Sequence, residues 1–103
     1  MTDDYQIPIP PSFQALYVDV RHRLTVPLVE YRARYDLCED MALLLVEQCQ
    51  AVHHDQGVSE DLILERVLAG LADAATGIDG AEARWVVTRL AELLSWPALP
   101  ARP

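Results

Sequence analysis

The sequence contains no lysine, and all eight of its basic residues are arginine. A phosphate-binding P-loop needs a lysine after its glycines, and an enzyme that forms a Schiff base needs a lysine amine. Only four glycines are present, and none lies in a Gly-x-Ser-x-Gly or Gly-x-Gly-x-x-Gly turn. These enzyme classes are therefore excluded. We expect a protein that is not an enzyme, with no catalytic residue, no cofactor and no metal.

Long hydrophobic runs are also missing. No run of about 18 apolar residues occurs, which is the length that a membrane-spanning helix needs. Residues 1–10 are acidic and contain prolines, unlike a secretory signal peptide. Cys38 and Cys49 are 11 positions apart, about 16 Å along a helix, which is beyond the reach of a disulfide. We therefore expect reduced thiols in a cytoplasmic protein.

The main positive signal is a long helical pattern from Pro27 to Gly57. Apolar or small residues recur there in steps of four and three, which keeps them on one face of an α-helix. This face comprises Tyr31, Tyr35, Cys38, Ala42, Leu45, Cys49 and Val52, widened by Leu37, Met41 and Leu44. Such a helix is roughly 40 Å long. Asp36 and Glu39 also fit a capping box, so a new start or a kink near Asp36 is an alternative. Because no Gly or Pro intervenes, we favour one continuous helix.

Three shorter helices are expected around this one. Ser12 is placed to cap the first, over residues 13–20. Gly57 and Gly77 fit the left-handed residue that ends a helix, and each is followed two residues later by a capping side chain. The third helix is expected from Ser59 to about residue 76 and the fourth from Asp79 to about residue 95. The expected buried residues of these two helices are Ile63, Leu64, Val67, Leu68, Leu71, Ala75, Ala83, Val86, Val87, Leu90, Leu93 and Leu94.

These patterns predict an all-α fold, an up-and-down helical bundle of about four helices with one long central helix. At 103 residues the chain is long enough for one domain. We divide it into an extended Pro-rich N-terminal arm (1–11), a helical domain (12–96) and a flexible tail (97–103). Short loops make consecutive helices antiparallel neighbours.

The charge is strongly acidic and unevenly distributed. Sixteen carboxylates give a net charge of −8, which disfavours direct nucleic-acid binding and anionic membranes. Residues 21–34 contain four arginines and one glutamate, whereas residues 35–65 contain eight acids and no arginine. The basic and acidic bands can pair within the fold or across a dimer.

The basic band offers a candidate anion site, because guanidinium groups bind phosphates and carboxylates through paired hydrogen bonds. Its residues are Arg21, Arg23, Arg32 and Arg34. The alternative is that these arginines pair with the protein's own carboxylates.

Large apolar side chains are candidates for partner binding. Trp85 lies at the edge of the buried face of its helix, which suits an interface, although tyrosines on the long stripe are equally typical of a core. The candidate partner-binding residues are Ile7, Ile9, Phe13, Tyr31, Tyr35 and Trp85.

Two further patterns have ordinary explanations. Cys49 and His53 have the spacing of helical zinc ligands, but a buried thiol and a histidine near a helix C-terminus explain them as well. The acids from Asp36 to Glu65 could mimic a nucleic-acid backbone, although a solvated face is the usual reason for such a run.

Three segments resemble a family of short bacterial all-helical proteins of uncharacterised function. They are Ile7–Leu16, Arg34–Asp40 and Trp85–Leu94, and the resemblance extends over nearly the whole chain. Members are sometimes labelled "ATPase with chaperone activity", a label that conflicts with the missing P-loop lysine. The resemblance implies no catalytic residues.

We therefore expect a non-enzymatic cytoplasmic protein-protein interaction or adaptor module that acts through helix faces. Its partner is another protein or a second copy, and a homodimer through exposed parts of the long helix is favoured. Alternatives are a module that binds a small molecule or nucleotide phosphate through the arginines, and an acidic regulator that mimics nucleic acid.

Overall fold

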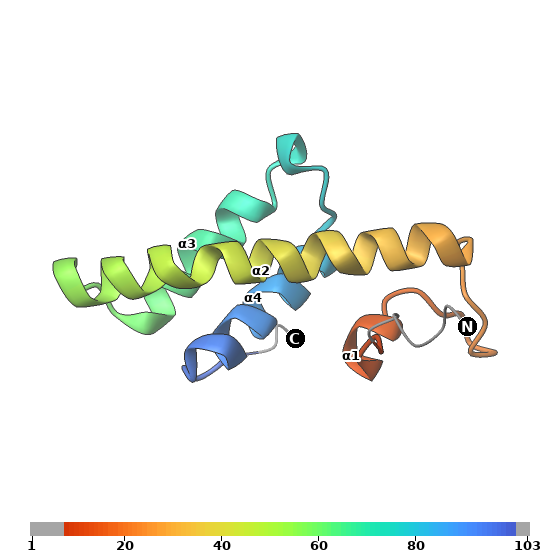
Figure 1. Ribbon diagram of the computed structural model, residues 1–103, viewed down its shortest axis with the longest axis horizontal. Coiled ribbons are helices and arrows are strands. Elements are labelled where there is room, and N and C mark those ends of the chain that lie inside the picture. The colour runs from red at the N-terminus through yellow and green to blue at the C-terminus, as the bar shows by residue number, and fades with distance from the viewer. Residues whose placement is uncertain (1–7, 101–103) are drawn as a thin grey trace.

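Helix α2 (Leu28–Gln56) forms the long axis of the molecule, and the other elements pack along it (Figure 1). The computed structural model describes residues 8–100 of the chain. The remaining elements in that range are α1 (Pro11–Gln14), α3 (Glu60–Leu71), a 3₁₀ turn η2 (Ala74–Thr76) and α4 (Gly80–Leu94). The predicted all-α bundle of four helices with one long central helix is confirmed.

Helix α2 is continuous over its 29 residues, a length of about 43 Å. Pro27 is its N-cap, so the helix begins one residue later than predicted. Gly57 ends it with φ +66°, a left-handed conformation that glycine adopts without a steric penalty. The alternative start or kink near Asp36 is wrong, because the hydrogen-bonded helix passes through that residue.

The predicted apolar face of α2, here called the stripe, faces the core. Its tyrosines, both cysteines and Ala42 are buried against α4 and α3, while Leu45 and Val52 are half-buried. The prediction that Leu37, Met41 and Leu44 widen this buried face is only partly correct. Leu37 and Met41 are half-buried, but Leu44 is 80% exposed because it lies on the far side of the helix from the stripe.

The first helix is shorter than predicted. It ends at Gln14, and the chain then forms a small hairpin in which Val18 pairs with Leu24 in an isolated antiparallel bridge. The Asp19 carboxylate accepts hydrogen bonds from the backbone N–H groups of Arg21 and Arg23, at 2.8 and 3.0 Å. Such local bonds offer the backbone an alternative to the helix. The hairpin therefore replaces the predicted helix over residues 15–20.

The third helix also ends early, at Leu71 instead of near residue 76. The Thr76 hydroxyl donates to the Leu71 carbonyl at 2.8 Å, and the Asp73 carboxylate accepts from the Ala75 N–H at 2.9 Å. These side-chain bonds cap the helix end and favour the turn η2. Ala75 is consequently exposed, and its predicted burial is wrong.

Helix α4 begins with a capping box at the predicted residue. The Asp79 carboxylate accepts from the Glu82 N–H at 2.7 Å, and the Glu82 carboxylate accepts from the Asp79 N–H at 3.2 Å. After α4, Leu99 from the predicted tail is half-buried and packs against the core. None of the helices that the structure describes combines the length and apolar character of a membrane span.

Phe13 provides a test of this core. Its side chain is fully buried, so Phe13→Ala is expected to lower the free energy of unfolding by about 3–5 kcal/mol through lost contacts and a cavity. Urea denaturation followed by circular dichroism measures the change. Val20→Ala is the control, because Val20 is 97% exposed and the change should stay within about 0.5 kcal/mol. An unchanged midpoint for Phe13→Ala would place Phe13 outside the core.

Candidate functional site

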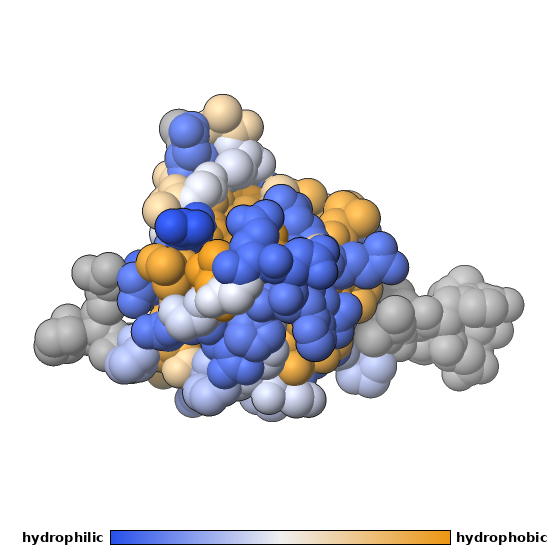
Figure 2. Space-filling view, turned by 90° about the vertical axis from the view of Figure 1, so that its left-hand side faces the viewer, coloured by the Kyte–Doolittle hydropathy of each residue, from blue (hydrophilic) through white to orange (hydrophobic). Residues whose placement is uncertain are grey.

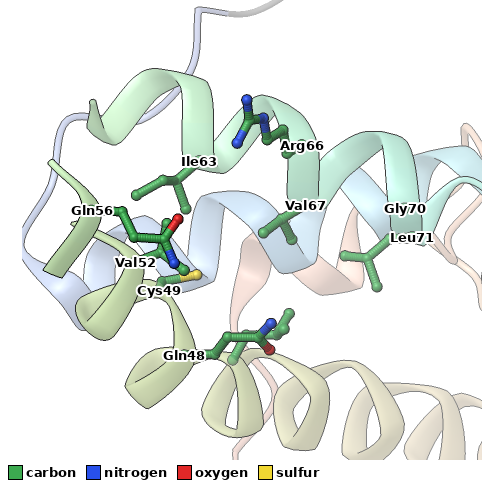
Figure 3. Close-up of a pocket in the computed structure, with 10 residues that line it drawn as sticks. Gln48, Cys49, Val52, Gln56, Ile63, Arg66, Val67, Gly70 and Leu71 are labelled. Carbon is green, nitrogen blue, oxygen red and sulfur yellow. The ribbon is translucent and has the colours of Figure 1, made fainter. Parts of the chain in front are cut away.

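An open apolar groove lies between the C-terminal half of α2 and helix α3, with a volume of about 420 Å³. Figure 3 shows side chains from α3 pointing across the gap toward α2, with Cys49 between the two helices. The apolar residues that line the groove are Leu45, Cys49, Val52, Ile63, Val67 and Leu71. Gln48, Gln56 and Arg66 supply polar groups at the groove. The arrangement matches the usual anatomy of a binding site, an apolar concavity with a few polar groups.

Side-chain size explains why the groove stays open. Small or medium side chains, such as Cys49, Val52 and Val67, occupy this part of the α2–α3 contact. Gly70 adds no side chain, and a Cβ placed there would meet no atom within 4 Å. The turn between the helices is held by His53, whose Nδ1–H donates to the Val58 carbonyl at 2.8 Å. Packing therefore brings the helices together at the turn and leaves them apart further along.

The apolar residues of the groove were predicted to lie in the core. Cys49, Ile63 and Leu71 are buried as predicted, whereas Leu45, Val52 and Val67 are only half-buried. The available signal for this partial exposure was Gly70, because an isolated glycine inside a helical pattern often has a packing or functional reason. The periodicity of α3 alone shows which face is apolar but not whether another element covers it.

The thiols of the protein are suited to packing and not to nucleophilic chemistry. Burial raises the pKa of Cys49, and burial together with the nearby Glu82 carboxylate raises the pKa of Cys38 to about 12. A thiol with a raised pKa carries little thiolate at neutral pH. Cys49 therefore contributes an apolar surface to the groove.

A buried ionic network lies nearer the N-terminal end of α2, between α2 and α4. Glu82 of α4 is only 1% exposed, and its carboxylate accepts hydrogen bonds from the Arg34 guanidinium of α2 and from the Tyr17 hydroxyl. Arg34 Nε lies 2.9 Å from Glu82 Oε2, and Arg34 Nη2 donates to the Gly77 carbonyl at 2.7 Å. The network thus joins the hairpin, α2, the η2–α4 loop and α4.

The pKa values in this network follow from its contacts. Burial by itself raises the pKa of Glu82, but the hydrogen bonds from Arg34, Tyr17 and the Asp79 N–H bring it below the ordinary value. Burial and the Glu82 carboxylate raise the pKa of Tyr17 to about 12. The hydrogen bond to Glu82 raises the pKa of Arg34 despite its partial burial. At neutral pH the site is a charged pair with a neutral tyrosine.

The predicted partner-binding aromatics form an internal cluster and need correction. Phe13, Tyr31, Tyr35 and Trp85 are all buried, with ring centroids of neighbouring pairs 5.1 to 6.1 Å apart. The Trp85 indole N–H donates to the Ser12 hydroxyl at 2.9 Å. These four side chains are therefore used inside the fold.

The two remaining partner-binding candidates come from the N-terminal arm. Ile9 is half-buried and packs against the core. Ile7 lies outside the described residues.

The predicted four-arginine site is divided by the fold. Arg34 is bound to Glu82 and to the Gly77 carbonyl. Arg21 and Arg23 lie in the exposed hairpin, and Arg32 is half-buried on α2. The role predicted for Arg34 in binding an external anion is corrected, because a buried carboxylate of the same chain takes its guanidinium.

His53 and Cys49 lie in different surroundings. The His53 ring packs against Trp96 with centroids 5.1 Å apart, and its Nε2 is 3.9 Å from a Glu60 oxygen. Cys49 instead faces the groove. Within residues 8–100, no group of three or more His, Cys, Asp and Glu side chains is arranged to hold a metal ion.

Comparison with known proteins adds no assignment: no family model, no curated protein and no solved structure matches this chain. The resemblance to short bacterial helical proteins stays a prediction.

The Arg34–Glu82 pair can be tested by removing its cation. Arg34→Met is expected to lower the free energy of unfolding at pH 7 by about 3 kcal/mol, because it leaves a buried carboxylate without its charged partner. The low pKa of Glu82 means that the pair stabilises the fold above the ordinary pKa of 4.5. That stabilisation is lost as the pH falls through the lower folded value. The difference from wild type should therefore shrink below about pH 4.5.

Chemical denaturation at a series of pH values measures this difference. Arg84→Met removes an exposed arginine from α4 and should change the free energy of unfolding by less than about 0.5 kcal/mol. An equal loss at pH 7 and pH 3 for Arg34→Met would contradict an electrostatic role.

Proposed function

We propose that the chain is a non-enzymatic protein-protein interaction module of the cytoplasm that binds an amphipathic helix of a partner protein. The observation that supports this most directly is the open apolar groove between α2 and α3. Recognition of a helix in a groove uses apolar residues spaced at i, i+3, i+4 and i+7 on the incoming helix. Helices α2 and α3 supply the two walls for such a ligand.

The groove offers contacts along both walls. Leu45, Cys49 and Val52 follow one another at helical spacing on α2, and Ile63, Val67 and Leu71 do so on α3. Cys49, Ile63 and Leu71 are almost fully buried, so the accessible apolar surface comes mainly from Leu45 and Val52 on α2 and Val67 on α3. Gln48, Gln56 and Arg66 can form hydrogen bonds at the rim, where interfaces are commonly polar.

The charge around the groove indicates the chemistry of the partner helix. From Leu45 to Leu71 the chain carries five acids and one arginine, and the arginine is Arg66. Figure 2 views the end of the molecule where α2 ends, and hydrophilic residues cover much of it with hydrophobic residues between them. Charge complementarity favours an incoming helix with an apolar stripe and basic flanks.

Two other functions have less support from the geometry. A phosphate site built on the arginine band lacks Arg34, which is bound to Glu82. A role as an acidic mimic of nucleic acid does not account for the apolar groove. A small apolar ligand fits the volume of the groove, and it becomes the alternative if the helical peptide described below does not bind.

Binding of a synthetic helix tests the proposal. The probe is a fluorescein-labelled peptide of about 18 residues, roughly 27 Å as a helix, with leucines at i, i+3, i+4 and i+7 and lysines elsewhere. Fluorescence anisotropy should show saturable binding to the wild-type chain. A peptide of the same composition in scrambled order should bind at least about tenfold more weakly, a difference of about 1.4 kcal/mol.

A matched pair of variants places the binding in the groove. Gly70→Leu fills open space beside the groove and improves helix propensity, so it should reduce peptide affinity at least about tenfold while α3 stays folded. Ala69→Leu adds the same side chain at the neighbouring exposed position, outside the groove, and should leave the affinity unchanged. Equal affinities for the two variants, or equal binding of the scrambled peptide, would refute helix recognition in this groove.

A further inference from the structure

Among the described residues that line the groove, Arg66 of α3 has the only charged side chain. At 100° per residue, Arg66 lies about 40° around the helix from Gly70 and about 60° from Ile63, on the side away from Val67. Figure 3 shows the Arg66 side chain extending along α3 toward Ile63, whereas Val67 points toward α2. Arg66 therefore lies at the rim of the groove.

The guanidinium of Arg66 is exposed and is not used inside the described fold. Other arginines form ion pairs with carboxylates of the chain: Arg23 with Asp19, Arg34 with Glu82, and Arg89 with Glu39 and Glu92. Within residues 8–100, no carboxylate oxygen lies within 4.0 Å of an Arg66 nitrogen. Arg66 is therefore available to a carboxylate of another molecule.

Helix geometry explains why Arg66 has no carboxylate partner on α3. Residues three or four apart lie side by side on a helix. The neighbours of Arg66 at these spacings are Leu62, Ile63, Ala69 and Gly70. All four are uncharged. Glu65 is adjacent in sequence but lies about 100° away around the helix, on the side opposite Ile63.

The two rims of the groove differ in charge. On α2 the polar residues that line it are Gln48 and Gln56, which are neutral amides. The five acids between Leu45 and Leu71 are not among the lining residues. Within the described chain, the groove thus has one cationic rim, on α3, and one neutral rim, on α2.

We propose that Arg66 is a specificity-determining residue of the groove and selects partner helices that carry an aspartate or glutamate beside their apolar stripe. This inference rests on the proposed recognition of a helix in the groove. A guanidinium binds a carboxylate through two parallel hydrogen bonds, which fix geometry as well as add energy. Because the α2 rim is neutral, the carboxylate determines which edge of the incoming helix faces α3.

The same contact disfavours other helices. A lysine at the edge that faces α3 would place a like charge against Arg66. The preferred ligand is therefore an amphipathic helix with an acid at one edge of its apolar stripe and basic residues elsewhere on its polar face.

Two peptides of identical composition test this selection by fluorescence anisotropy. Each is the leucine-lysine helix described above with two lysines replaced by glutamates, either at one edge of the leucine stripe or on the far face. The wild-type chain should bind the edge peptide at least about threefold more tightly, the scale of one exposed ion pair. At about 1 M salt the preference should shrink, because the screening length falls to about 3 Å. Circular dichroism checks that the two peptides are equally helical.

A matched pair of variants assigns the preference to Arg66. Arg66→Gln keeps a polar side chain without the charge, so it should bind the two peptides with equal affinity. Arg84→Gln removes the same charge from an exposed position on α4, outside the groove, and should keep the preference. Both sites are exposed, and circular dichroism checks that each variant is folded.

Failure of this inference can be told apart from failure of helix recognition. If both peptides bind and Gly70→Leu weakens them, but the wild-type chain shows no preference, the groove accepts a helix and Arg66 does not select it. A preference that persists in Arg66→Gln, or that Arg84→Gln abolishes, would also overturn the role of Arg66. Absence of saturable binding by either peptide would overturn both proposals.

Discussion

The buried carboxylate of Glu82 is the constraint on which the arrangement of this molecule depends. A charge that is almost entirely removed from water is tolerated only when it is paired and hydrogen-bonded. Glu82 meets this condition through Arg34 of α2, Tyr17 of the hairpin and the backbone N–H of Asp79. Arg34 in turn reaches the Gly77 carbonyl. The register of α4 on α2, the position of the hairpin and the path of the η2–α4 loop are therefore linked through one side chain.

The two ends of α2 are packed in different ways, and side-chain size is the reason. Near the N-terminal end, the rings of Phe13, Tyr31, Tyr35 and Trp85 fill the space between α1, α2 and α4. Near the C-terminal end, the side chains between α2 and α3 are shorter and Gly70 has none. The first region is closed and specifies the fold. The second is open and supplies the groove.

The molecule thus presents two kinds of surface on one long helix. On the stripe side, the part of α2 beside α3 keeps an apolar groove that suits an amphipathic helix. On the opposite side, Leu43 and Leu44 are exposed between Asp40 and Glu47.

The sequence alone determined the helices that have strong periodicity and clear ends. The span of α2 follows from its stripe and from Gly57, and the start of α4 follows from Gly77 and the N-cap side chain of Asp79. Local bonds that compete with a helix were harder to foresee. Asp19 and Thr76 use their side chains to turn the backbone, and so α1 and α3 end earlier than periodicity suggests.

Only the tertiary structure decided whether each candidate functional residue is buried, paired within the chain or exposed. Arg34 and Trp85 look like binding candidates in one dimension, but their hydrogen-bond partners, Glu82 and Ser12, are 48 and 73 positions away. The groove depends in the same way on which apolar residues of α2 and α3 are left uncovered. Local pattern fixes the face that a residue occupies, because helix geometry is local. Burial, pairing and exposed grooves depend on packing between distant segments, which a single sequence does not display.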